Sequence, residues 1–184
     1  MLVLIKGAGD LATGTAVRLY RAGIKVVMTE VAQPTAVRRT VAFSQCMYDG
    51  AAQVEGISAR RAEDAGAARR ALERGEVPVL CDPEAAILRE LSFDGVVDAI
   101  LAKRNLGTAI TDAPVVLALG PGFTAGVDCH GVVETMRGHN LGRLLTQGSA
   151  APNTGVPGDV GGYTTQRIIR APADGAFEPL AAIG

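Results

Sequence analysis

The sequence predicts an α/β fold of the Rossmann-like type, with a mostly parallel sheet flanked by helices and a short or truncated C-terminal β segment. Short apolar runs recur up to residue 120 and are typical of buried parallel strands. Stretches with helical spacing of apolar residues separate several of these runs. A glycine turn directly follows the first run, which is the arrangement of a dinucleotide-binding βαβ unit.

The first βαβ unit is predicted over residues 2–30. The run Leu2–Ile5 predicts a strand, residues 11–19 predict a helix that ends at Gly23, and residues 25–28 predict a second strand. In the intervening turn, Gly7 permits a sharp bend and Gly9 lets a phosphate approach the backbone. The free N–H groups at the helix start favour an anion.

The glycine spacing departs from the standard G-x-G-x-x-G pattern. Gly14 lies five residues after Gly9, and Ala12 occupies the place of the third glycine. Glu30 follows Gly9 by about the 20 residues expected for an acid that binds a ribose hydroxyl. We therefore predict nucleotide or cofactor binding by the loop and Glu30, with Thr13 among the loop's binding candidates. A tight turn without a ligand is the alternative.

Asp10 introduces a carboxylate into this predicted anion site. We expect it to cap the helix by accepting bonds from free N–H groups. If it instead faces the ligand, it favours a sugar, an amine or a metal-bound group. Arg38 and Arg39, in the loop after the second strand, are candidate phosphate contacts or residues of a solvated helix face.

Composition narrows the class of protein. The chain has 184 residues, 48% of them hydrophobic and 20% charged, with a net charge of −1 and 4% aromatic residues. These values give no sign of a nucleic-acid or membrane partner. Three separated cysteines and two histidines predict neither a disulfide framework nor a metal site. With no leader or apolar span recognised, a cytoplasmic location is expected.

The rest of the chain continues the alternation of strands and helices. A hairpin with its turn at Gly56 is expected over residues 52–62, and a helix over residues 63–74. Cys81 closes the next strand and is expected to be buried. The other expected elements are a helix running from residue 36 towards Tyr48, a helix over 84–91 capped by Asp82, and strands over 95–102, 115–119 and 127–135.

Two further candidate sites follow predicted strands. Asp98, Lys103 and Asn105 bring an acid, a base and an amide close together, for an anion, a proton transfer or a structural ion pair. Gly120 and Gly122 form a second glycine loop that can place backbone N–H groups near a ligand. Cys129 and His130 are neighbours on a strand and point to opposite faces, so no nucleophile–base pair is predicted.

The composition changes at Gly148. We expect a Rossmann-like cofactor-binding domain over residues 1–147, a Gly/Pro-rich loop or linker over 148–163, and the start of a truncated C-terminal β region over 164–184. A strand and a tight turn are expected within residues 166–175. Because many Rossmann domains dimerise, a homodimer is also expected.

Several long segments, in order along nearly the whole chain, resemble one protein family. They are IKGAGDLATG, VVMTEVAQPTAVRRTVAF, VVDAILAKRN, ALGPGFTAGVD, VVETMRGHNLGR and GSAAPNTGVPG. The chain resembles the accessory-protein family of the selenium-dependent molybdenum hydroxylase system, which is related to the xanthine dehydrogenase accessory proteins.

The resemblance implies a maturation role in which the molybdenum cofactor is bound and delivered to a molybdenum hydroxylase apoenzyme. The Gly7–Gly14 loop and Glu30 would then form the cofactor site, and a binding protein is favoured over an enzyme. An NAD(P)-dependent oxidoreductase is the alternative, since Glu30 favours NAD over NADP. A nucleotide-sensing domain remains a third reading.

Overall fold

The computed structural model, which describes residues 1–176, 178 and 180, contains one nine-stranded, mostly parallel sheet. The strand order is β3-β4-β5-β2-β1-β6-β7-β8-β9. Neighbouring strands are parallel except for the pairs β3–β4 and β8–β9. The predicted α/β fold with a mostly parallel sheet is confirmed.

The strands are short, as the apolar runs indicated. They are β1 (Leu2–Lys6), β2 (Lys25–Glu30), β3 (Ala51–Val54), β4 (Ile57–Ala62), β5 (Val77–Cys81), β6 (Gly95–Asp98), β7 (Val116–Leu119), β8 (Gly131–Val133) and β9 (Leu144–Leu145). The chain passes from β1 through β2 to β5 on one side, and then returns to place β6 on the other side of β1. The carboxyl edge between β1 and β6 is therefore the switch point where doubly wound folds bind ligands.

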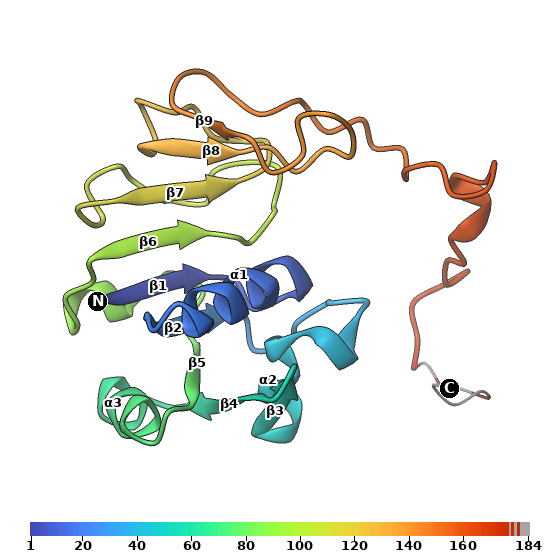
Figure 1. Ribbon diagram of the computed structural model, residues 1–184. Helices are drawn as coiled ribbons and strands as arrows, with labels where there is room; N and C mark the ends of the chain where they lie inside the picture. The colour runs from blue at the N-terminus through green and yellow to red at the C-terminus, as the bar shows by residue number, and fades with distance from the viewer. Residues whose placement is uncertain (177, 179, 181–184) are drawn as a thin grey trace. The chain divides into compact units, whose positions relative to one another are not determined.

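Helices cover the two faces of the first half of the sheet. One face packs against α1 (Asp10–Arg21) and α2 (Cys46–Asp49), with Phe43, Ala16 and Ile5 fully buried between them. The other packs against α3 (Ala65–Glu73) and the short 3-10 helix η3 (Ala86–Arg89). In Figure 1, α1 lies in front of β1 and β2.

The second half of the sheet is built differently. Residues 99–115 and 120–130 are all described, and none of them is helical. On the α1 side, Leu117, Leu119 and Val133 are half-buried, and Leu144 is exposed. The predicted alternation of strand and helix thus stops after η3, and strands β6–β9 extend beyond the helices in Figure 1.

Several predicted element boundaries are wrong. The helix expected from residue 36 is instead two 3-10 turns, η1 (Arg39–Val41) and η2 (Phe43–Gln45), followed by the single turn of α2. The strand expected over 95–102 ends at Asp98, and residues 99–102 are not in a strand. The strand expected over 127–135 is limited to β8 because residues 124–129 form a turn bonded to themselves.

The chain separates into two compact units, Met1–Asn153 and Thr154–Gly184. Within the second unit, the described residues contain an isolated bridge between Val160 and Tyr163 and a 3-10 turn, η4 (Thr165–Arg167). The strand expected within 166–175 is not formed there. Parts of the C-terminal β prediction, residues 177, 179 and 181–184, lie outside the described residues. No helix in the described part of the chain is long and apolar enough to cross a bilayer.

Candidate functional site: a glycine cleft at the switch point

A cleft of about 360 Å³ opens at the carboxyl edge of the sheet, beside the β1–α1 turn. The turn, the end of β2 and the segment after β6 contribute to its walls, and the loop after β2 completes them. The lining residues are Gly7, Gly9, Asp10, Leu11, Ala12, Glu30, Val31, Thr35, Ala36, Ala99, Ile100 and Leu101. This volume lies near the lower end of the range for small-molecule sites, about 300–1,000 Å³.

The two cleft glycines have different physical roles. Gly7 has φ +94°, and a Cβ there would lie 3.0 Å from the Ala99 carbonyl oxygen. A side chain would thus collide with the opposite wall as well as strain the backbone. Gly9 has φ −65°, and nothing lies within 4 Å of an added Cβ. The absence of a side chain at Gly9 therefore leaves space in the cleft, and no neighbouring atom of the protein requires a glycine there.

Glu30 ties the glycine turn to the end of β2. Its carboxylate accepts the Ala8 N–H at 2.9 Å through Oε2 and the Val31 N–H at 2.8 Å through Oε1. An ionised carboxylate has roughly four acceptor positions, so the cleft-facing group retains capacity for ligand hydroxyls. Glu30 is therefore both a support of the loop and a potential ligand contact.

The expected capping role of Asp10 is wrong. Gly9 is the N-cap of α1, no side chain caps this helix, and Asp10 is the first helical residue. Its carboxylate instead pairs with the guanidinium of Arg38, which is largely exposed. The pairing with Arg38 connects the start of α1 to the loop after β2.

Thr13 and Gly14 do not line this cleft. Thr13 is buried, where its hydroxyl donates to the Ala8 carbonyl at 3.2 Å and accepts the Phe43 N–H at 2.8 Å. Gly14 is exposed, and both residues line a separate hollow of about 370 Å³ against β3. Thr13 thus has a structural role in holding the η2 segment on the turn.

Of the alternatives for the cluster after β6, a structural ion pair between Asp98 and Lys103 is not formed, because Asp98 bonds Thr108 and the Ile100 N–H instead. Asp98 is 1% exposed and accepts the hydroxyl proton of Thr108 at 2.6 Å, and the same hydroxyl accepts from Lys6 Nζ at 2.6 Å. Lys103 is exposed. Asn105 forms a turn by accepting the N–H groups of Gly107 and Thr108. None of these residues lines the cleft.

Gly120 and Gly122 make close contacts within the chain. A Cβ on Gly120 would lie 2.7 Å from Thr135 Oγ1, and one on Gly122 would lie 2.5 Å from the Arg104 nitrogen. Their positive φ values, +77° and +109°, form the bend after β7. Close packing against the segments after β6 and β8 therefore explains both glycines without a ligand.

Sequence reasoning missed Lys6 and Thr108. Lys6 ends an otherwise apolar strand, and a charge in that position is the signal that could have identified it. Thr108 carries no comparable signal, because its position between Lys6 and Asp98 depends on the path of a ten-residue segment. The expectation that Cys81 is buried is also wrong: its side chain is exposed beside the end of β2.

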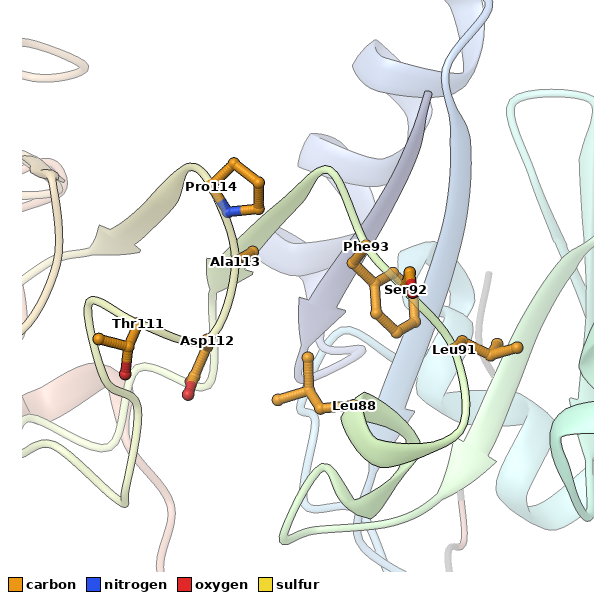
Figure 2. A pocket seen from close by; sticks show the side chains of 8 residues that line it. All are labelled: Leu88, Leu91, Ser92, Phe93, Thr111, Asp112, Ala113 and Pro114. Atoms are coloured by element: carbon orange, nitrogen blue, oxygen red, sulfur yellow. The ribbon is translucent and has the colours of Figure 1, made fainter.

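A larger cavity of about 530 Å³ lies at the opposite, amino-terminal edge of the sheet. Figure 2 shows it between the segment carrying Leu88 and Phe93 and the segment from Thr111 to Pro114. Its one carboxylate, Asp112, accepts the Ala109 N–H of its own loop at 3.1 Å. The glycine cleft is the better candidate because it combines a switch point, an open glycine and a carboxylate.

The chain was compared with protein families, curated proteins and solved structures. No family model matches the chain, and no solved structure matches it. The chain is 55% identical over 183 residues to an uncharacterized protein, YqeB, of Escherichia coli strain K12. The match covers 100% of this chain and 34% of that protein, so the chain spans about a third of the length of this relative.

Proposed function

We propose that the chain binds the molybdenum cofactor, or a related nucleotide, in the glycine cleft and acts as an accessory protein in the maturation of molybdenum hydroxylases. The observation that carries the proposal is the position of Gly9 and Glu30 in one cleft at the switch point. The ordered motifs quoted above support the choice of cofactor and of a hydroxylase apoenzyme as partner.

The cleft suits a ligand that carries both phosphate and hydroxyl or amino groups. Leu11 and Ala12 line it in the first turn of α1, where N–H groups have no intrahelical acceptor and no side chain caps the helix. Glu30, at the end of β2, provides acceptor positions in the same cleft. A pterin with a phosphate group offers partners for both ends of such a site.

The direct test is calorimetric titration with molybdenum cofactor, NAD, NADP and ATP against three proteins. These are the unmodified chain, Gly9→Val and Gly14→Val. Neither glycine has an atom within 4 Å of an added Cβ, and both have negative φ, so the two variants are matched. We expect micromolar binding of molybdenum cofactor that is lost in Gly9→Val alone.

Two outcomes contradict this proposal. If the unmodified chain binds none of the four compounds, the cleft is not a nucleotide-type site. If it binds NAD and not molybdenum cofactor, the oxidoreductase alternative takes its place. In that case Glu30→Gln should weaken NAD binding by about tenfold to a hundredfold, which corresponds to roughly 1.5–3 kcal/mol for a hydrogen bond to a charged group.

A further inference from the structure

The side chains of Lys6, Thr108 and Asp98 form a buried hydrogen-bond network next to the cleft. Lys6 Nζ donates to Thr108 Oγ1 at 2.6 Å, and Thr108 Oγ1 donates to Asp98 Oδ2 at 2.6 Å. Their residues are 3%, 3% and 1% exposed, respectively. Burial of charged groups is costly unless they are paired and hydrogen-bonded, so this arrangement strongly favours one position of Thr108.

This hydrogen-bond network adjoins two walls of the cleft. Lys6 directly precedes Gly7, and Asp98 directly precedes Ala99, while the Ala99 N–H donates to the Lys6 carbonyl at 2.9 Å. Gly7 and Ala99 face each other in the cleft at close backbone contact. A shift of this hydrogen-bond network would therefore alter the distance between Gly7 and Ala99, and with it the width of the cleft.

The segment between Asp98 and Thr108 contains two residues in unfavourable backbone conformations. Leu101 and Lys103 have φ values of +61° and +64°, which are unfavourable for residues with a side chain. Such conformations persist where surrounding contacts hold them in place, and they are frequent at ligand sites. Leu101 lines the cleft, so its strained backbone is part of the wall.

We infer that Lys6, Thr108 and Asp98 are positioning residues that hold the 99–108 segment as a wall of the glycine cleft. Ligand affinity then depends on three side chains that do not line the cleft. Asn105 and Gly122 assist by shaping the turn before Thr108 and by packing against Arg104. This inference rests on the proposed function in placing the ligand in the cleft.

The test compares Thr108→Val, which removes both bonds, with Thr108→Ser, which keeps the hydroxyl. Thr111→Val is the matched control, because Thr111 is an exposed threonine in the same connection. Hydrogen–deuterium exchange of the unliganded proteins is measured first. We expect at least tenfold faster exchange at Ala99 and Ile100 in Thr108→Val, because their N–H groups donate to the Lys6 carbonyl and to Asp98 Oδ1. The other two variants should change this exchange by less than twofold.

Affinity is measured next by titration with molybdenum cofactor, NAD and ATP. Any probe that the unmodified chain binds should bind at least tenfold more weakly to Thr108→Val and within twofold to Thr108→Ser and Thr111→Val. Unchanged affinity despite faster exchange overturns the inference, as does faster exchange spread equally over β1, β5 and β6. The latter pattern is what a purely structural role produces.

If Thr108→Val does not fold, Lys6→Met replaces it, because this variant removes the first bond and leaves the Thr108–Asp98 bond intact. At least threefold faster exchange confined to Ala99 and Ile100 supports the inference, and unchanged exchange overturns it. A chain that binds none of the probes contradicts the proposed function, whereas the exchange measurement still tests the support of the segment.

Discussion

Glu30 and Glu134 show the same arrangement at the carboxyl ends of two strands, β2 and β8. Each carboxylate stands at the end of a strand and accepts two backbone N–H groups, Ala8 and Val31 for Glu30, and Met136 and Ala151 for Glu134. Bonds to an ionised carboxylate are stronger than those between neutral groups. Single acidic residues thus connect irregular segments to the parallel strands.

The three cysteines should differ in reactivity. Burial raises the pKa of the Cys46 thiol to about 12 and also raises the pKa of Cys129, whereas Cys81 is exposed. Because the thiolate is the nucleophile, we expect one adduct, at Cys81, when the native chain is treated with iodoacetamide near pH 8. Peptide mass spectrometry locates it. Cys81→Ser should take up no reagent, and adducts on Cys46 or Cys129 in the native chain would refute the prediction.

At the scale of elements, the β1–α1–β2 unit formed as the residues indicated because its signals are local. Apolar periodicity, a glycine turn and a stop near Gly23 all occur within thirty residues. The loops after β6 and β7 did not follow from such signals. Their course depends on the close approach of Gly122 to the Arg104 backbone, which lies in a different loop far from it in the sequence.

Two glycines in the loops after β7 provide a matched pair of substitutions. Gly122 and Gly126 both have positive φ, but an added Cβ meets the Arg104 backbone at 2.5 Å only in the first case. Gly126→Ala should cost about 1 kcal/mol through backbone strain. Gly122→Ala should cost roughly 1–3 kcal/mol more, because the neighbouring loop must move.

Urea unfolding of both variants measures the difference in their free energies of unfolding, which follows from the two midpoints when the m-values are equal. Equal destabilisation by Gly122→Ala and Gly126→Ala would show that the loop after β7 is not packed closely against the loop after β6.

Across the whole first unit, the sheet joins a helix-covered half to a half built from loops. Residues near its end return to the sheet, where the Gly148 carbonyl accepts the Ala125 N–H at 2.7 Å and the Ala151 N–H reaches Glu134. Glu134 therefore links the last part of Met1–Asn153 to β8. The stability of this unit should depend on the charge of that carboxylate.

The pH dependence of stability has a defined sign. The Ala151 and Met136 N–H groups hold the pKa of Glu134 below its ordinary value, against the opposing effect of burial. The unfolded chain then binds more protons than the native chain between the two pKa values, so stability falls as pH drops below about 4.3. Glu134→Gln should flatten this fall in urea titrations from pH 6 to pH 3.

A matched comparison uses Glu76, whose pKa is lowered chiefly by its hydrogen bond with Arg60. Glu76→Gln and Glu134→Gln should each reduce the loss of unfolding free energy between pH 6 and pH 3. An unchanged slope in Glu134→Gln would mean that this carboxylate has the same pKa in the folded and unfolded chain.

The α/β class, the first βαβ unit and the joint location of Gly7, Gly9 and Glu30 follow from the residues alone, because each depends on local spacing and on parallel strands that end at one edge. The other features depend on tertiary packing. Lys6, Thr108 and Asp98 come together because β6 returns beside β1 and a ten-residue segment folds back over both strands. The spacing of residues in the sequence does not indicate that return, so the bonding of Asp98 to Thr108 rather than to Lys103 follows only from the tertiary packing.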